Sequence, residues 1–330
     1  MKDDDKGVSR RDLFRNLGAA MAVTIRGGAE PGTGPAERAP KRADVPGSVP
    51  TRSQDTVLRR RIPSSGEEIP AVGLGTWRTF DVGDGEESRA PLRDVLSGFT
   101  RLGGSVIDSS PMYGRSEAVL GELTAELGLR PRLFLATKVW TRGRDDGVRE
   151  MQRSLELLRS ERIELMQVHN LVDAGTHLET LAGWKHDGRV RYIGVTHYRA
   201  EAYAELERAL TANSVDFVQL NYSLGERDAE RRLLDVAADR GVAVLVNRPF
   251  TGSALFSRVR GRTVPAWAAE FGARSWAQFF LKWILSHPAV SCAIPATSDP
   301  HHLEDNMGAL RGRLPDPAER VRMTESFDSL

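Results

Sequence analysis

The sequence has very little cysteine, no long apolar run and almost no net charge. Cys292 is the one cysteine among 330 residues, which excludes a disulfide framework and a metal cluster built on cysteine thiolates. No apolar stretch approaches the roughly 20 residues that cross a bilayer, so no stable membrane insertion is expected. Because 46 basic side chains balance 45 acidic ones, we expect no nucleic-acid or other polyanion surface. The length leaves room for one large domain or two ordinary ones.

The first fifty-odd residues differ in composition from the rest. Residues 9–15 read Ser-Arg-Arg-Asp-Leu-Phe-Arg and resemble the twin-arginine export signal of bacteria, and a short apolar stretch follows from Leu17 to Ile25. Residues 27–53 are rich in Gly, Pro, Ala and charges, which is typical of a linker. We expect residues 1–54 to be an export signal and disordered linker, and residues 55–330 to fold.

This signal implies the twin-arginine translocation machinery as a partner and a periplasmic or membrane-tethered protein. The alternative is a cytoplasmic protein whose tail contains a chance arginine pair.

Beyond the linker, candidate strands and helices alternate at a regular interval. Strand-like runs begin at residues 106, 133, 163, 190, 217, 242 and 291, so that successive starts differ by 27, 30, 27, 27, 25 and 49 residues. An earlier run, 71–76, makes eight. Apolar residues three and four apart predict helices at 92–102, from 116, and at 146–159, 176–187, 201–212 and 228–240.

This alternation predicts the fold class α/β, with parallel strands joined by right-handed crossovers. Eight units in about 240 residues favour a closed (β/α)8 TIM barrel. Residues 57–62 and 67–69, separated by a Pro-Ser-Ser-Gly turn, predict a β-hairpin that closes the N-terminal mouth. An open doubly wound sheet is the alternative, but the first strand lacks the Gly-x-Gly-x-x-Gly turn of such a dinucleotide site. The last segment, Pro317 to Leu330, is polar and helix-like.

In a barrel, functional residues gather at the carboxyl ends of the strands. Four ionisable groups fall there on three consecutive strands: Asp108, Tyr113, Lys138 and His169. A buried Lys138 is costly unless it is paired, and Asp108 on the adjacent strand is its natural partner. We expect the ammonium to lower the pKa of Tyr113; a change from about 10 toward 7 takes roughly 4 kcal/mol. The plain alternative is a strand-loop-helix connection in which Tyr113 only packs.

From about Val72 to Leu310 the sequence resembles the aldo-keto reductase family. The Asp-x4-Tyr-Gly segment from Asp108, Lys138 after an apolar strand and His169 at the end of the next match that family's catalytic tetrad in order and spacing. The resemblance implies that Tyr113 is the general acid that protonates a carbonyl oxygen while a reduced nicotinamide delivers hydride. Lys138 and Asp108 would adjust the pKa of Tyr113, and His169 would orient the carbonyl.

The resemblance also implies NADPH, or alternatively NADH, as the cofactor. The family's amide-binding Ser-Asn pair reads Thr196-His197 here, and its aromatic stacking position is Asn247. The implied cofactor contacts are Gly75, Thr76, Trp77, Thr196, His197, Gln219, Asn247, Arg248, Pro249, Phe250, Gly252, Ser253, Ala296, Thr297, His302, Asp305 and Asn306. Ala296 and His302 stand where the family has a lysine and an arginine that bind the 2′-phosphate of the cofactor. Each lost charge-assisted contact is worth roughly 1.5 to 3 kcal/mol. We therefore expect weaker discrimination for NADPH over NADH than the family usually shows.

The expected substrate is a small aldehyde or ketone bound in a pocket that includes Trp77, Trp140 and Asn170. The protein is expected to act as a monomer. No metal site is expected, because the histidines are spread singly over strand ends. A glycosidase would need two carboxylates across the mouth, whereas the fourth and seventh strands end in His169-Asn170 and Asn247-Arg248. The alternative function is a nucleotide-binding barrel with a regulatory or sensing role and little turnover.

Overall fold

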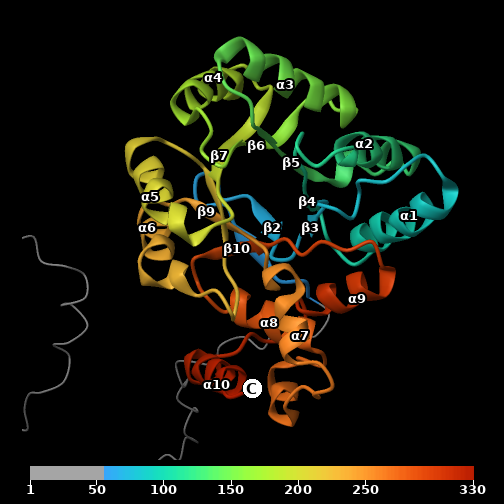
Figure 1. The fold of residues 1–330 in the computed structure, drawn as a ribbon, viewed down its shortest axis with the longest axis vertical. Helices are drawn as coiled ribbons and strands as arrows, with labels where there is room; N and C mark the ends of the chain where they lie inside the picture. Colours follow the sequence, from blue (N-terminus) through green and yellow to red (C-terminus); the bar gives the residue numbers. More distant parts are fainter. Residues whose placement is uncertain (1–55) are drawn as a thin grey trace, which may run out of the picture. The chain divides into compact units, whose positions relative to one another are not determined.

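The computed structural model describes residues 56–330, and the arginine pair at positions 10 and 11 lies outside the described residues. Eight parallel strands form one sheet, in the order in which they follow one another along the chain (Figure 1). Two further bridges, Val72 to Ala293 and Gly75 to Ala296, join its first and last strands and close it. The predicted TIM barrel is therefore confirmed. The strands are β3 (Leu74–Gly75), β4 (Val106–Asp108), β5 (Phe134–Val139), β6 (Ile163–His169), β7 (Val190–Thr196), β8 (Phe217–Asn221), β9 (Ala243–Asn247) and β10 (Val290–Ala293).

Helices surround this sheet because each carries one apolar face. In α1, for example, Leu92, Val95, Leu96 and Phe99 are buried at helical spacing. Every strand β5 to β8 is buried over most or all of its length, as expected of strands covered by helices on one face and by the barrel interior on the other. The helices are α1 (Glu86–Arg101), α2 (Ser116–Glu126), α3 (Arg144–Leu157), α4 (Ala174–His186), α5 (Tyr203–Ala212), α6 (Leu233–Asp239), α7 (Ala254–Arg258), α8 (Trp276–Leu285), α9 (Pro300–Gly308) and α10 (Pro317–Asp328).

Two helical segments differ from their prediction. The segment 228–240 is divided into a 3-10 turn, Asp228–Arg231, and α6, with Arg232 in non-helical conformation between them. The chain's last segment is a helix with a buried face, since Met323 and Phe327 are almost fully buried and Phe327 contacts Phe280. The buried face was not predicted because the segment is polar overall. Its two buried apolar side chains are four residues apart and therefore lie on the same face of a helix.

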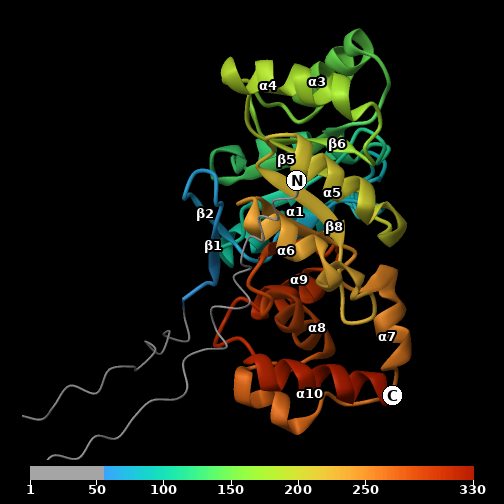
Figure 2. The same cartoon turned by 90° about the vertical axis from the view of Figure 1, so that its left-hand side faces the viewer.

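The predicted hairpin is present as β1 (Arg59–Arg61) and β2 (Glu68–Pro70), which pair antiparallel. Ile62 and Ile69 are buried in one cluster with residues that begin barrel strands, such as Val106 and Phe134. Figure 2 shows the hairpin at one side of the sheet. It thus closes the end of the barrel at which the strands start.

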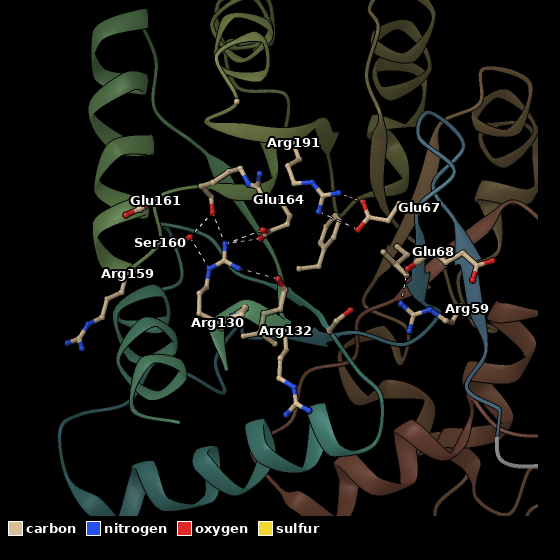
Figure 3. A pocket seen from close by; sticks show the side chains of 17 residues that line it. Arg59, Glu67, Glu68, Arg130, Arg132, Arg159, Ser160, Glu161, Glu164 and Arg191 are labelled. Atoms are coloured by element: carbon tan, nitrogen blue, oxygen red, sulfur yellow. Dashed lines mark hydrogen bonds and ion pairs between the residues drawn. The ribbon is translucent and has the colours of Figure 1, made fainter. Parts of the chain in front are cut away.

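A pocket of about 930 Å³ lies beside this hairpin (Figure 3). Its central charges are already paired: Arg130 binds Glu164 at 3.1 Å, and Arg191 binds both oxygens of Glu67. Arg130 also donates to Ser160 and to two backbone carbonyls. The Arg130 contacts hold the β4–β5 and β5–β6 connections together, and Arg191 ties β7 to the hairpin. This is the end of the barrel that usually serves stability rather than catalysis.

No helix among residues 56–330 combines the length and the apolar character needed to cross a membrane.

Candidate active site

The register of the parallel strands brings the predicted tetrad together at the opposite end of the barrel. Asp108 ends β4, Lys138 is the fifth residue of β5, and His169 ends β6. Lys138 pairs with Gln167, two residues before His169, so the three strands end at a common level. Tyr113 follows in the loop after β4, where its N–H donates to the Ser110 carbonyl at 3.0 Å and closes a tight turn.

Asp108 and Lys138 form the expected ion pair, and both are buried. Lys138 Nζ donates to Asp108 Oδ2 at 2.7 Å and to the Ser109 carbonyl at 2.6 Å. Burial opposes the charge on Lys138, but Asp108 and Tyr113 outweigh it, so the pKa of Lys138 is raised. The ammonium is therefore present at neutral pH.

Two glutamines complete the coordination of the Asp108 carboxylate. Gln167 Nε2 and Gln219 Nε2 donate to Asp108 Oδ1 at 3.1 and 2.9 Å. Each carboxylate oxygen thus accepts at least one hydrogen bond, which keeps a buried charge stable. Sequence reasoning missed Gln167. A polar residue in register with Lys138, inside an otherwise apolar strand, is the signal that could have identified it.

The expected depression of the Tyr113 pKa is wrong in direction. Burial raises the pKa of Tyr113 above its usual value, although the charge and hydrogen bonding of Lys138 act to lower it. Lys138 Nζ lies 4.8 Å from the centroid of the Tyr113 ring, so the two side chains do meet as predicted. The consequence is a neutral phenol, which still holds the proton that a general acid must donate.

His169 is an uncharged imidazole. Burial, the charge of Lys138 and that of His197 lower the pKa of His169 from 6.5 to about 2. Its ring lies edge-on to Tyr113, with centroids 6.0 Å apart, and 6.2 Å from the ring of Trp140. The side chain can therefore orient a polar substrate group by hydrogen bonding without changing the net charge of the site.

The side chains expected to hold the nicotinamide amide lie next to this group. Thr196 Oγ1 and Asn247 Nδ2 both donate to Gln219 Oε1, at 3.2 and 3.3 Å. Gln219 in turn binds Asp108, so a continuous hydrogen-bond network joins the tetrad to the ends of β7 and β9. His197 is half-exposed and stacks on Tyr198, with centroids 5.6 Å apart.

Two asparagines at this mouth hold acceptor atoms without a partner. Asn170 Oδ1 and Asn247 Oδ1 are buried and accept no hydrogen bond from the described residues. The Asn247 orientation is set by its Nδ2, which faces the carbonyl oxygens of Gln219 and His197. Unpaired buried acceptors cost roughly 1–3 kcal/mol each. Their presence here fits a ligand that brings N–H donors, as the carboxamide of a nicotinamide does.

The loop after β9 has an unusual backbone. Arg248, Thr251 and Ser253 all have positive φ, at 49°, 50° and 79°, as does Gly252 at 62°. Such non-glycine conformations are strained and persist only where the surroundings enforce them. The ring of Phe250 packs against Phe256 of α7 and Phe280 of α8. Arg248 lies 3.8 Å from Glu226.

The residues expected at the adenosine end lie in the loop after β10 and in α9. The Asp299 carboxylate caps α9 by accepting from His301 N and His302 N. The His302 side chain is 75% exposed and 3.9 Å from Asp299. Asp305 is bound by Gln278, and Asn306 is buried.

Gly75, Thr76 and Trp77 follow β3 at the mouth. A side chain at Gly75 would meet the backbone of Ile294, which keeps this position small. Thr76 is buried and donates to the Asp108 carbonyl at 3.0 Å. Trp77 and Trp140 are each 43% exposed, and exposed Met112 and Tyr198 also follow barrel strands. Large apolar side chains therefore surround the entrance to the site.

Comparison with known proteins supports the same assignment. Residues 71–322 match the model of the aldo/keto reductase family. The chain is 29% identical to methylglyoxal reductase YeaE of Escherichia coli over 265 residues, which cover 78% of this chain and 91% of that one. It is 25% identical to the NADP-dependent D-sorbitol-6-phosphate dehydrogenase of Malus domestica, over 80% of this chain and 92% of that one.

Solved structures agree with these matches. An aldo-keto reductase from Klebsiella pneumoniae in complex with NADPH superposes with a TM-score of 0.65 at 25% identity, over 79% of this chain and 92% of that one. The site geometry, the barrel and the family match lead to one conclusion: the chain belongs to the aldo/keto reductase family of oxidoreductases.

Proposed function

We propose that the protein reduces aldehyde or ketone carbonyls to alcohols with NADPH. The observation that carries this proposal is the buried Asp108–Lys138 pair beside the neutral phenol of Tyr113, at the open mouth of the barrel. A bound reduced nicotinamide would supply the hydride to the carbonyl carbon. Tyr113 donates its proton to the carbonyl oxygen, and Lys138 stabilises the phenolate that remains. His169, uncharged, orients the carbonyl by a hydrogen bond.

The residues present fit the nicotinamide end of the cofactor. Thr196, Gln219 and Asn247 place hydroxyl and amide groups side by side, and two buried acceptor atoms accept no hydrogen bond from residues 56–330. The fit at the adenosine end is weaker, because Ala296 and His302 offer no permanent cation. NADH is therefore proposed as a second cofactor.

We propose that the substrate enters between the exposed rings of Trp77 and Trp140, next to Asn170. The apolar entrance favours a carbonyl compound with an apolar or aromatic body. A panel of aldehydes and ketones, with oxidation of NADPH as the readout, tests the class.

A Tyr113→Phe variant tests the catalytic proposal against nucleotide binding without turnover. Removal of one hydroxyl should abolish reduction while leaving the affinity for NADPH within a few-fold of the wild type. Retained turnover in this variant would contradict the assignment of Tyr113 as the acid. Binding of NADPH with no turnover by the wild type on any carbonyl would favour the regulatory role.

We also propose that residues 1–54 direct export by the twin-arginine route and that residues 55–330 form the catalytic domain, which acts as a monomer. The support is the pattern Ser-Arg-Arg-Asp-Leu-Phe-Arg and the change of composition after residue 53. Replacing both arginines, Arg10→Lys with Arg11→Lys, should retain the protein inside a bacterial cell. Unchanged fractionation would show that the tail is not an export signal.

A further inference from the structure

Ser110 contacts two residues of the proposed site at once. Its hydroxyl oxygen lies 3.1 Å from His169 Nδ1, and its carbonyl accepts the hydrogen bond from Tyr113 N. Ser110 is fully buried in the loop between β4 and α2. It is therefore tied to the proposed acid through the backbone and to the imidazole through the side chain.

The hydrogen-bond inventory of Ser110 decides which nitrogen of His169 carries the proton. A serine hydroxyl has one hydrogen to donate and lone pairs that accept. Met112 N already donates to Ser110 Oγ, at 3.4 Å. If His169 Nδ1–H also donated to it, the buried hydroxyl hydrogen would have no acceptor among the described residues, at a cost of roughly 1–3 kcal/mol. If the hydroxyl donates to Nδ1 instead, both the Ser110 hydroxyl hydrogen and His169 Nδ1 have a partner.

The other nitrogen of the ring is then free for the substrate. His169 Nε2 makes no hydrogen bond with residues 56–330, while Tyr113 and Trp140 flank the ring. With Nδ1 occupied as an acceptor, a neutral imidazole carries its one proton on Nε2. That proton can be donated to a carbonyl oxygen, which a ring of the opposite tautomer could not do.

We propose that Ser110 is a positioning residue that holds His169 in the Nε2–H tautomer and so orients the carbonyl for reduction. The proposal of a carbonyl substrate rests on the function proposed above, whereas the tautomer is a property of the protein alone. Ser110 acts through His169 and does not itself contact the reacting atoms.

The first test reads the tautomer directly. Full-length protein labelled with 15N in its seven histidines is studied by long-range 1H–15N correlation, and His169→Asn identifies the His169 signals. We expect the wild type to show a protonated Nε2 and an unprotonated Nδ1. In Ser110→Ala, we expect both tautomers of His169 to be populated and to interconvert. Ser110→Thr, which keeps the hydroxyl, should restore the wild-type pattern. A wild type protonated at Nδ1, or an unchanged Ser110→Ala spectrum, would overturn the proposal.

The second test measures the consequence for turnover on a carbonyl that the wild type reduces. Ser110→Ala should lower kcat roughly tenfold, equivalent to about 1.4 kcal/mol, with the Kd for NADPH unchanged and with recovery in Ser110→Thr. Ser154→Ala is the matched control, because Ser154 is a buried serine whose hydroxyl donates to Glu117 rather than to a residue of the proposed site. An equal loss of kcat in this control would overturn the positioning role.

The two tests separate this inference from the proposed function. If no carbonyl is reduced, the proposed function fails, yet the tautomer measurement still confirms or overturns the role of Ser110. If reduction is observed and His169 is protonated on Nδ1, only the inference fails.

Discussion

The centroid of the Tyr113 ring lies 4.8 Å from Lys138 Nζ and 6.0 Å from the centroid of the His169 ring, and each of these side chains holds the protonation state that its surroundings favour. Burial raises the pKa of Tyr113, so its phenol stays protonated through neutral pH. The pKa of Lys138 is raised as well, because Asp108 outweighs the effect of burial. His169, with a pKa of about 2, stays neutral. A neutral acid, a fixed cation and a neutral hydrogen-bond donor are the combination that carbonyl protonation needs.

This combination predicts the pH dependence of reduction. Neither Tyr113 nor His169 titrates between roughly pH 4 and pH 10, so these groups should leave kcat/KM flat there, with a decline only where the phenol ionises above pH 10. In Lys138→Met the influence that lowers the Tyr113 pKa is lost, so the decline should move to higher pH. The phenolate would also lose its cation, and kcat should fall roughly 10²–10³-fold.

Initial rates measured across this pH range on wild type and Lys138→Met check the prediction. A step near pH 6 to 7 in the wild type would show that His169 titrates in the functional range, contrary to its burial beside an ammonium.

The sequence was sufficient to predict that Asp108, Tyr113, Lys138 and His169 lie together, since strand ends at regular spacing meet on one side of a barrel. It was insufficient for Gln167 and Ser110, whose roles depend on which neighbour a buried polar group reaches. The pKa of Tyr113 was misjudged for the same reason. Charge can be read from residue types, whereas the depth of burial that outweighs it cannot.

At the scale of elements, a buried lysine joins α8 to the chain after α9. Lys282 is fully buried, and its ammonium donates to the carbonyls of Arg311 and Arg313 at 2.6 and 3.0 Å. Burial and the charge of Arg313 lower the pKa of Lys282 from 10.5 to about 8. The folded state therefore loses this proton at a lower pH than the unfolded chain does.

This difference predicts how stability depends on pH. Between pH 8 and 10.5 the unfolded state binds more protons at this site, so the contribution of Lys282 to the free energy of unfolding should rise with pH, by about 3 kcal/mol in total. Lys282→Met should lack this rise. Urea unfolding of the wild type and of Lys282→Met between pH 7 and 10 isolates the contribution of Lys282, because the tyrosines and Cys292 titrate alike in both proteins. A constant difference between them would show that Lys282 keeps an ordinary pKa.

The loop after β10 and the start of α9 predict the choice of cofactor. With exposed Ala296 and His302 in place of two cations, the wild type should favour NADPH over NADH by less than about a hundredfold. Ala296→Lys with His302→Arg should increase that preference by at least roughly tenfold, since each charge-assisted contact is worth about 1.5–3 kcal/mol.

Titration of both nucleotides into each protein measures the preference. Ser298→Lys, which adds the same charge at an exposed neighbouring position, controls for general electrostatic attraction. A wild-type preference beyond a hundredfold would mean that another cation, such as Arg248 or His301, binds the 2′-phosphate.

Element boundaries followed the sequence where apolar spacing was strong and departed from it elsewhere. Segments 146–159 and 176–187 were predicted to within two residues of α3 and α4. The interruption at Arg232 was not predicted, because apolar spacing continues across it. In α10 the composition was polar, and only the packing of Phe327 against Phe280 shows which face is buried.

At the scale of the whole molecule, the repeat of strand and helix predicted the barrel, because eight strand-helix units in about 240 residues match the size of a closed eightfold barrel. Its two ends then differ in kind. At one end the hairpin and paired charges such as Arg191 with Glu67 close the interior. At the other end the side-chain oxygens of Asn170 and Asn247 are buried without a hydrogen-bond partner in the described part of the chain. Stability and activity should therefore respond to substitutions at different ends.

Ile69 provides the test of this separation. It is 2% exposed in β2 and packs into the interior cluster below the tetrad. Ile69→Ala removes three carbon atoms from this cluster and should lower the free energy of unfolding by roughly 2–5 kcal/mol. Because the mouth is formed by the other ends of the strands, kcat/KM well below the unfolding transition should stay within about twofold of the wild type. Lys138→Met, at the mouth, should instead affect activity more than stability, with a large loss of kcat. If Ile69→Ala lost activity while still folded, the hairpin would have to support the geometry of the active site, and the two ends of the barrel would be coupled.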